Sequence, residues 1–545
     1  MYDNLLTTDT MNILRRIGIL CAALVLFFVT AAAQQATPIP KFVKQSDGQY
    51  AFYVDGKPFF MFGSQSGNSN NWPAMHPQLF KTMADMNANT LETPISWEAV
   101  EPVEGQFDFS SVKAIIDEAR AHDIRLVLLW FATWKNGSPH YVPEWVKLDS
   151  KKYYNVVAKD GRPIDSPSPH CTALMEKDAR AFAKFMEYLK EYDPCHTVIM
   201  VQVQNEPGTW DSVRDYSKSV DKLFNSNVPD ALLKKEYLEE LGAKADKGTW
   251  SQVFGERADE YFHAWSVASY IEYVAAAGKA VNPLPMYVNV AMRSPFGNPP
   301  ATNYESGGAT DNVICIYKAA APSIDFCAPD IYQNGDANYM KSIELYTRPD
   351  NALMVPETGS NPKYLYEVVS RGIGFSPFGV DGGRNIGSLA DEYAMLRPVA
   401  DKLMEWRLGG QIFTAFEPED HAVQHLDLGE WQAILTFGRA RRSNVQGAPD
   451  TGEPLPATGH AMLVKLGPDE YYAFGTNVRY TFQPQGKNKG KAWHFLRVEE
   501  GSFDKDGKWV MRRILNGDQT DWTGPYVGNQ PTVLKIKLYT REPRK

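Results

Sequence analysis

The chain has 545 residues, too many for one ordinary domain, and 43% of them are hydrophobic and 12% aromatic, enough for a large core. Its formal net charge of -9 argues against a nucleic-acid partner, because phosphate binding requires basic patches. The sequence lacks CxxC and HExxH motifs and any paired His/Cys cluster, so structural zinc and metalloprotease sites have no support.

The N-terminal segment has the pattern of a secretory signal. Arg15 and Arg16 precede an apolar run over residues 17–30, and small residues follow at 31–33, which predicts cleavage before Gln34. The polar residues before Met11 do not fit this pattern, so we take Met11 as the start of the signal. The apolar run is short for a membrane span. We therefore expect an exported protein, periplasmic or extracellular, with no membrane span in the mature chain; an uncleaved membrane anchor is the alternative.

Removal of residues 1–33 would leave four cysteines, Cys171, Cys195, Cys315 and Cys327. An exported compartment permits disulfides. Four cysteines allow three full pairings, and the sequence does not choose among them.

Eight short apolar runs between residues 59 and 376 alternate with amphipathic stretches. Continuous apolar runs are typical of strands buried on both faces. The predicted strands are 59–63, 89–93, 125–130, 197–203, 285–290, 324–328, 352–355 and 372–376, and helices are predicted over 111–122, 178–192 and 257–278.

Eight strand-then-helix units in succession predict a (β/α)8 TIM barrel. A doubly wound open sheet is the alternative, but no GxGxxG follows a first strand. The segment from Gly208 to Gly255 is long for one connection, and we expect it to form an elaborated loop beside the active site.

The composition changes after about residue 408, where helical periodicity gives way to short strand-like runs at 470–474, 492–498 and 532–538. This favours a C-terminal all-β domain of the sandwich type. The predicted organisation is a signal peptide (1–33), a catalytic barrel (34–405) and a β-sandwich domain (406–545). The last could bind glycan, support the barrel or form a homodimer.

Two glutamates stand at the ends of predicted barrel strands. Glu206 lies in Gln204-Asn205-Glu206-Pro207-Gly208 after the fourth strand, and Glu357 lies in Val355-Pro356-Glu357-Thr358-Gly359 at the end of the seventh. TIM-barrel enzymes place their catalytic groups at this end of the strands. A pair of carboxyls is what glycosidic cleavage requires, one to protonate the leaving oxygen and one to attack the anomeric carbon or activate a water.

Asn-Glu-Pro after strand four with a Glu after strand seven resembles glycoside hydrolase clan A. Residues 93–102 and 104–109 resemble the strand-two region of the β-galactosidase families 35 and 42. The chain as a whole, with segments 130–137 and 374–379, is similar to the bacterial branch of family 35 that carries a β-rich C-terminal domain. The resemblance covers about residues 40–540.

This resemblance implies that Glu206 is the general acid/base and Glu357 the nucleophile of a retaining enzyme, with carboxyl groups roughly 5–5.5 Å apart. It implies that Asn205 binds the sugar 2-hydroxyl and that Tyr332, in Pro329-Asp330-Ile331-Tyr332, lies near the nucleophile. Many family 35 enzymes have Asn-Ala-Glu after strand three, where this chain has Trp134-Lys135-Asn136.

Six tryptophans lie at or near loops on the expected active face: 72, 97, 130, 134, 145 and 210. Aromatic rings stack on the apolar faces of sugars and also fill cores. We expect two or three of these to contact sugar, with Trp134 the first choice, and we predict Trp134, Asn136 and Trp97 as substrate-binding residues. Glu98 and Glu101 are interpreted as supporting residues.

The leading hypothesis is an exo-acting β-galactosidase on plant or other complex glycans, with a carbohydrate as its partner and no cofactor, because proton transfer and carboxylate attack need none. Alternatives are another clan A activity (β-glucosidase, β-mannosidase or endo-glycanase), a catalytically silent carbohydrate-binding protein, and a structural surface protein.

Overall fold

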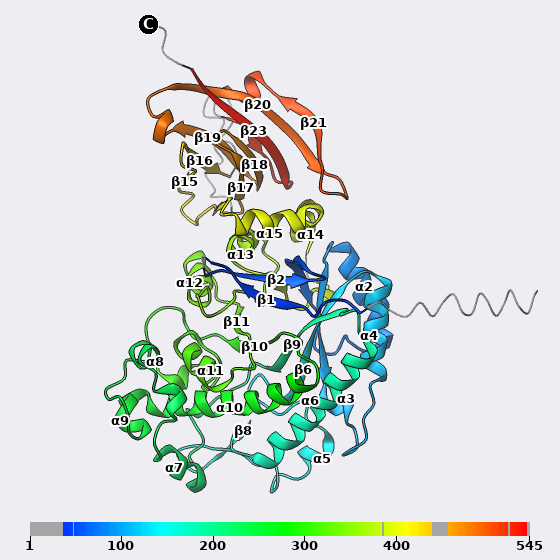
Figure 1. Cartoon of the computed structure of the whole chain (residues 1–545), viewed down its shortest axis with the longest axis vertical. Coiled ribbons are helices and arrows are strands. Elements are labelled where there is room, and N and C mark those ends of the chain that lie inside the picture. Colours follow the sequence, from blue (N-terminus) through cyan, green and yellow to red (C-terminus); the bar gives the residue numbers. More distant parts are fainter. Residues whose placement is uncertain (1–35, 47, 384–385, 439–455, 522–523, 542–545) are drawn as a thin grey trace, which may run out of the picture.

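The computed structural model describes residues 36–46, 48–383, 386–438, 456–521 and 524–541. Its first part is a barrel of parallel strands surrounded by helices, and its second part is built mainly from β-strands (Figure 1). The predicted fold, a (β/α)8 barrel followed by an all-β domain, is confirmed.

Eight parallel strands close the barrel in the order β10-β11-β12-β13-β4-β5-β6-β9. Each contains part of a predicted strand. The strands are β4 (Met61–Gln65), β5 (Thr90–Ser96), β6 (Arg125–Lys135), β9 (Val198–Asn205), β10 (Met286–Ala291), β11 (Phe326–Ile331), β12 (Val355–Thr358) and β13 (Gly374–Pro377).

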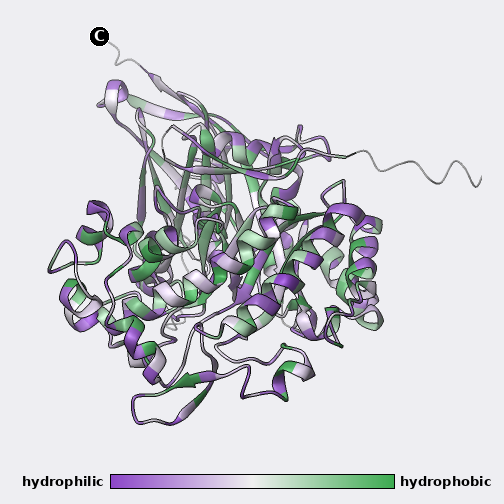
Figure 2. Ribbon diagram, turned by 60° about the horizontal axis from the view of Figure 1, so that its bottom comes forward, coloured by the Kyte–Doolittle hydropathy of each residue, from purple (hydrophilic) through white to green (hydrophobic). Residues whose placement is uncertain are grey.

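Apolar side chains line both sides of the barrel wall, because successive strand residues point to opposite faces. On β10, Tyr287 packs in the interior core, whereas Met286 and Val288 pack against the outer helices. The lower barrel interior is therefore a packed core with no channel. In Figure 2 apolar residues gather along the central strands and polar residues along the outer helical faces.

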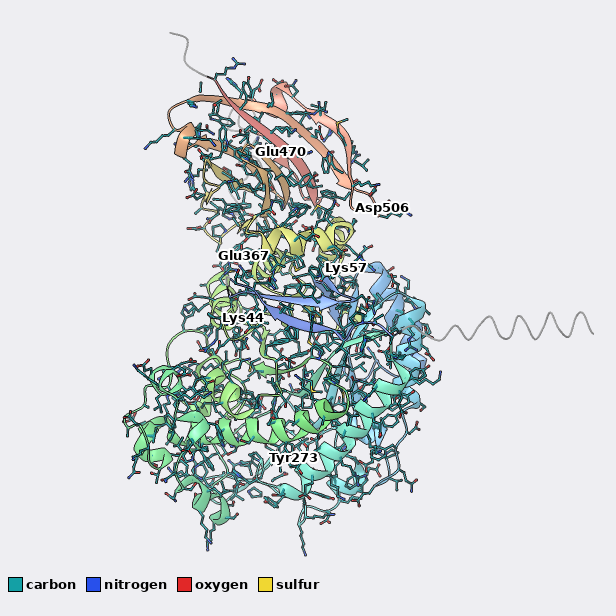
Figure 3. All side chains as sticks on the ribbon, in the orientation of Figure 1. Lys44, Lys57, Tyr273, Glu367, Glu470 and Asp506 are labelled. Atoms are coloured by element: carbon teal, nitrogen blue, oxygen red, sulfur yellow. The ribbon has the colours of Figure 1, made fainter. Side chains whose placement is uncertain are left out.

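A small antiparallel sheet packs against the interior core of the barrel. It consists of β1 (Lys41–Lys44), β2 (Tyr50–Val54) and β3 (Lys57–Pro58). Phe52 and Val54 enter the interior core, and Phe42 meets the ring of Phe326 at a centroid distance of 5.1 Å. Lys44 and Lys57, labelled in Figure 3, mark this sheet.

Helices cover the outside of the barrel. Among the closest pairs are α6 and α10, which lie side by side along the outer wall near β6 and β9. Tyr273 on α10 reaches the molecular surface (Figure 3). The helices are α2 (His76–Asp85), α3 (Trp97–Val100), α4 (Ser110–Ala121), α5 (Glu144–Lys147), α6 (Thr172–Tyr192), α10 (Ala258–Val281), α11 (Ile314–Ala320), α12 (Asp336–Tyr346), α13 (Leu365–Arg371), α14 (Gly387–Leu396) and α15 (Ala400–Leu408).

The long connection from Gly208 to Gly255 contains three short helices, α7 (Lys218–Phe224), α8 (Lys235–Glu240) and α9 (Trp250–Phe254). Its first residues remain at the barrel mouth, where Thr209 pairs with Ser306 from the loop after β10. A second short sheet, β7 (Asn155–Val157) with β8 (Pro163–Pro167), lies in the loop after β6.

The C-terminal part contains two antiparallel sheets, of six and four strands. The six-stranded sheet consists of β14 (Ile412–Phe416), β17 (His460–Gly467), β18 (Glu470–Thr476), β23 (Thr532–Arg541), β20 (Ala492–Phe503) and β21 (Trp509–Leu515). The four-stranded sheet consists of β15 (Gln424–Asp427), β16 (Trp431–Phe437), β19 (Val478–Pro484) and β22 (Tyr526–Val527). The boundary predicted after residue 405 falls inside α15.

The inner strands of the six-stranded sheet are buried on both faces. On β18, Tyr471 and Ala473 join the core shared with the four-stranded sheet. The alternate residues Tyr472 and Phe474 join the barrel core, and Tyr472 meets Trp406 of α15 at a centroid distance of 5.8 Å. One sheet therefore belongs to two hydrophobic cores.

The predicted signal segment lies outside the described residues. Within the described ranges, the structure contains no helix long and apolar enough to cross a membrane. Cys171, Cys315 and Cys327 are free thiols, so none of the three full disulfide pairings forms.

Candidate active site

Both predicted catalytic glutamates lie at the C-terminal mouth of the barrel and line the same cavity. Glu206 follows the last residue of β9, and Glu357 is the third residue of β12. Each is almost fully buried, with 7% and 6% exposure. The cavity has a volume of about 360 Å³ and is lined by Asn136, Glu206, Trp210, Ala291, Glu305, Tyr332, Glu357 and Phe378.

The backbone at the end of β9 is strained. Gln204 and Glu206 have φ angles of 66° and 42°, in the left-handed region that non-glycine residues rarely adopt. Two hydrogen bonds hold Glu206 there: its N–H donates to Oδ1 of Asn289 (2.8 Å), and its carbonyl accepts from the N–H of Gly137 (3.1 Å). The barrel thus fixes the direction of this carboxyl at a local conformational cost.

Glu206 is adapted to carry a proton near neutral pH. Burial and the adjacent charge of Glu357 raise its pKa to about 7, against an opposing effect of Lys135. A carboxyl with this pKa can give up a proton and take it back at physiological pH, which is what a general acid/base requires.

Glu357 is held as an acceptor on both of its oxygens. The phenol of Tyr332 donates to Oε1 (2.8 Å), and the amide of Gln65, at the end of β4, donates to Oε2 (3.3 Å). Donors to both oxygens fix the orientation of this carboxyl.

A third acid, Asp330 on β11, lies between the two glutamates. It is paired with Glu357 across the strands, and its Oδ2 accepts from the amide of Asn289 (2.7 Å). Its other oxygen has no amide or hydroxyl donor but lies close enough to Glu206 for a proton to stand between the two carboxyls. Burial and both glutamates raise the pKa of Asp330 well above its usual range.

Two further buried acids complete the site. Glu92 on β5 accepts from the phenol of Tyr287 (3.0 Å), and burial raises its pKa to about 8. Glu305, in the loop between β10 and α11, is 1% exposed and lines the cavity. Burial raises the pKa of Glu92, Glu305 and Asp330, so these three acids hold their protons more readily than an exposed carboxyl does.

The sequence did not indicate Glu92, Glu305, Asp330 or Asn289 as site residues. Glu305 belongs to no motif, and the pairing of its loop with Thr209 helps to bring it to the mouth. Asp330 could have been predicted from its position two residues before Tyr332. Alternate residues of a strand share a face, so the two side chains would be expected on the same side of the sheet.

Of the other predicted site residues, three lie at or beside the cavity and two lie in the hydrophobic core. Asn136 and Tyr332 line the cavity. Asn205 is fully buried beside it, and neither polar atom of its amide has a hydrogen-bond partner among the described residues.

Trp97 and Trp134 are not where the prediction placed them, because both are fully buried in the core outside the barrel wall. The indole N–H of Trp97 donates to Glu101 (2.9 Å), and the ring of Trp134 packs edge-on against Tyr270 of α10 at 4.7 Å. Neither ring can meet a sugar. The tryptophan on the cavity is Trp210, which is 44% exposed.

Within the described residues, no group of three or more histidine, cysteine, aspartate or glutamate side chains is arranged to hold a metal ion.

Two family models match the chain. Residues 66–259, which include β5, β6, β9 and Glu206, match the glycoside hydrolase 42 model, described as β-galactosidase. Residues 389–524 match a domain of unknown function, DUF5597. The barrel fold, the pair of carboxyls on the cavity and the match to the glycoside hydrolase 42 model together support a glycoside hydrolase.

A β-galactosidase of Xanthomonas manihotis is 27% identical over 208 residues, which make up 33% of this chain. The chain spans about a third of that relative's length, with 32% of the relative covered.

Solved structures with a similar arrangement include the cold-adapted β-galactosidase from Rahnella sp. R3, with a TM-score of 0.47, 12% identity, and coverage of 89% of this chain and 100% of that one. Another is the β-mannanase from the blue mussel Mytilus edulis, with a TM-score of 0.41, 12% identity, and coverage of 66% and 96%. Neither likeness bears on the substrate.

Proposed function

We propose that this protein is a retaining, exo-acting β-galactosidase that works by double displacement, with Glu206 as general acid/base and Glu357 as nucleophile. The observation that carries the proposal is that two carboxyls on one cavity have different surroundings. Glu206 has a pKa of about 7 and can hold a proton, whereas Glu357 accepts hydrogen bonds on both oxygens. The finer assignment to the bacterial family 35 branch is part of the same proposal.

In the first step, a carboxylate oxygen of Glu357 attacks the anomeric carbon while the bond to the leaving oxygen breaks and Glu206 gives that oxygen its proton. In the second step, the ionised Glu206 takes a proton from a water, the water oxygen attacks the anomeric carbon, and the bond to Glu357 breaks. Two inversions give net retention. We expect the two carboxyls to approach the roughly 5–5.5 Å separation of retaining enzymes when substrate is bound.

The form of the cavity supports exo action. A volume of about 360 Å³ lies at the low end of the range for small-molecule sites, about 300–1,000 Å³, and suits a terminal sugar better than a long chain segment. The buried amide of Asn205, whose two polar atoms have no hydrogen-bond partner among the described residues, supports its assignment to the sugar 2-hydroxyl.

Export to the periplasm or the extracellular space, inferred from the pattern of residues 1–33, is a separate part of the proposal. A fusion of those residues to a reporter that is active only after export would test it. Absence of reporter activity would contradict it.

Hydrolysis of a panel of nitrophenyl glycosides by the wild type, Glu206→Ala and Glu357→Ala tests the activity, with the anomer of the first product followed by NMR. We expect turnover of the β-galactoside with retention, and losses of roughly 10²–10⁴-fold in the variants. Glu98→Gln is the matched control, because this partly exposed glutamate pairs with Lys147 outside the cavity. Turnover of a different sugar would correct the substrate, and an inverted product would overturn the mechanism.

A further inference from the structure

Glu305 is the one acid on the cavity to which the proposed mechanism gives no role. It lies in the loop between β10 and α11, and antiparallel hydrogen bonds between Thr209 and Ser306 (2.8 and 3.0 Å) attach this loop to the segment after Glu206. The preceding Tyr304 anchors the loop to Glu260 through its phenol. The position of Glu305 is thus fixed by the contact of Tyr304 before it and by the pairing of Ser306 after it.

Two glycines make room for this carboxyl. A Cβ atom on Gly137 would lie 2.3 Å from Oε1 of Glu305, and one on Gly208 would lie 2.7 Å from its Cγ. Both glycines border catalytic elements: Gly137 donates to the carbonyl of Glu206, and Gly208 follows it by two residues. The backbone around the general acid therefore has the shape of a slot for the side chain of Glu305.

Neither oxygen of Glu305 has a hydrogen-bond partner among the described residues, although the side chain is 99% buried. The ring of Trp210 lies beside the carboxyl but does not reach hydrogen-bond geometry. Burial and Glu206 raise the pKa of Glu305 well above its usual range, so the carboxyl is a neutral group that can both donate and accept. Leaving such a buried group unpaired is unfavourable, and a hydrogen bond to a bound hydroxyl would offset that cost.

The charged neighbours of Glu305 indicate which side of the substrate it meets. The charged groups that act on the carboxyl of Glu305 are those of Glu206 and Lys135. Glu206 protonates the leaving oxygen, whereas Glu357 attacks the sugar that is retained in the first step. The exposed ring of Trp210, on the same cavity, supplies an apolar surface beside Glu305.

We propose that Glu305 hydrogen-bonds hydroxyl groups of the sugar on the leaving-group side of the scissile bond, with Trp210 as the stacking surface, so that the enzyme selects glycosyl leaving groups. The inference rests on the proposed glycosidase function. It assigns Glu305 to substrate selection and not to bond cleavage.

The test compares two substrates with the same glycone: lactose, whose leaving group carries hydroxyls, and 4-nitrophenyl β-galactoside, whose leaving group carries none. The variant is Glu305→Met, which keeps the length of the side chain and removes its hydrogen bonds. We expect kcat/KM for lactose to fall by about 10–100-fold and kcat/KM for the nitrophenyl glycoside to change less than about threefold.

Glu305→Gln is the matched variant, because its amide can also donate and accept, and we expect it to retain most of the lactose activity. Equal losses on both substrates in Glu305→Met, with an unchanged melting temperature, would overturn the inference and place Glu305 at the glycone or at Glu206. Unchanged activity on lactose would overturn it as well. A wild type that hydrolyses neither substrate nor any other glycoside pair would instead contradict the proposed function.

Discussion

The phenol of Tyr332 donates a hydrogen bond of 2.8 Å to Oε1 of Glu357, although 46% of the tyrosine is exposed. A half-exposed residue therefore orients a carboxylate that is itself almost fully buried. Because Tyr332 follows β11 and Glu357 lies on β12, the contact also joins neighbouring strands at the mouth of the barrel.

Tyr332→Phe removes this hydrogen bond and keeps the ring. A hydrogen bond to a charged group contributes about 1.5–3 kcal/mol, so we expect kcat to fall by roughly 10–100-fold. The measurement is steady-state turnover of the best nitrophenyl glycoside. Tyr339→Phe is the control, since that phenol contacts Thr358 and not Glu357. Equal losses in both variants would show that the effect is structural.

The pH dependence of turnover should report Glu206. Its proton is required in the first step, so kcat/KM should fall as the pH rises through about 7. The same measurement on Glu206→Ala with a dinitrophenyl glycoside, whose leaving group needs no proton, should show no fall near pH 7. If the fall persists in that variant, the titrating group is not Glu206.

Glu92 should make the fold less stable in alkali. Its pKa rises from 4.5 in the unfolded chain to about 8 in the folded one, so the unfolded state binds fewer protons between these values. Folding stability from this group is complete below pH 4.5 and declines as the pH rises to about 8, by up to about 1.4 kcal/mol per pH unit.

Glu92→Gln cannot ionise, and its carbonyl can still accept from Tyr287. The melting temperature of this variant should therefore decline less between pH 5 and pH 8 than that of the wild type. Glu98→Gln, which changes a partly exposed glutamate outside the interior, serves as the control. Parallel curves for Glu92→Gln and the wild type would contradict the assignment.

Substitution of Trp210 should weaken substrate binding, whereas substitution of Trp134 should lower the stability of the fold. Trp210→Ala removes an exposed ring from the cavity, so KM should rise while the melting temperature stays unchanged. Trp134→Ala leaves a void in a packed core, and such losses cost about 3–5 kcal/mol. Thermal unfolding with kinetics on the same samples checks both. A lowered melting temperature for Trp210→Ala would mean that its ring is structural.

The barrel was predictable because its strands are buried on both faces and read as continuous apolar runs. Their ends were less predictable. β6 was expected to end at Trp130 but continues to Lys135, so Trp134 is still a strand residue and points outward against α10 instead of standing on a loop. The position of Glu206 at the barrel mouth was predictable because it follows a clear strand within Asn-Glu-Pro.

Glu305 had no comparable signal. Its place at the mouth depends on a loop–loop pairing between residues almost one hundred positions apart in the chain, and no local periodicity carries that information. The same holds for the steric role of Gly137 and Gly208, which is visible only when the neighbouring carboxyl is in place.

The six-stranded sheet, with Tyr471 turned to one core and Tyr472 to the other, links the melting of the two parts of the chain. Apolar burial on both faces means that neither part can unfold without exposing the other's interior to water. Thermal denaturation should then follow a single calorimetric transition, and a chain ended after Leu408 should aggregate and not survive as a free barrel. The β-domain covers apolar surface of the barrel. We therefore expect unfolding of the β-domain to unfold the active site as well.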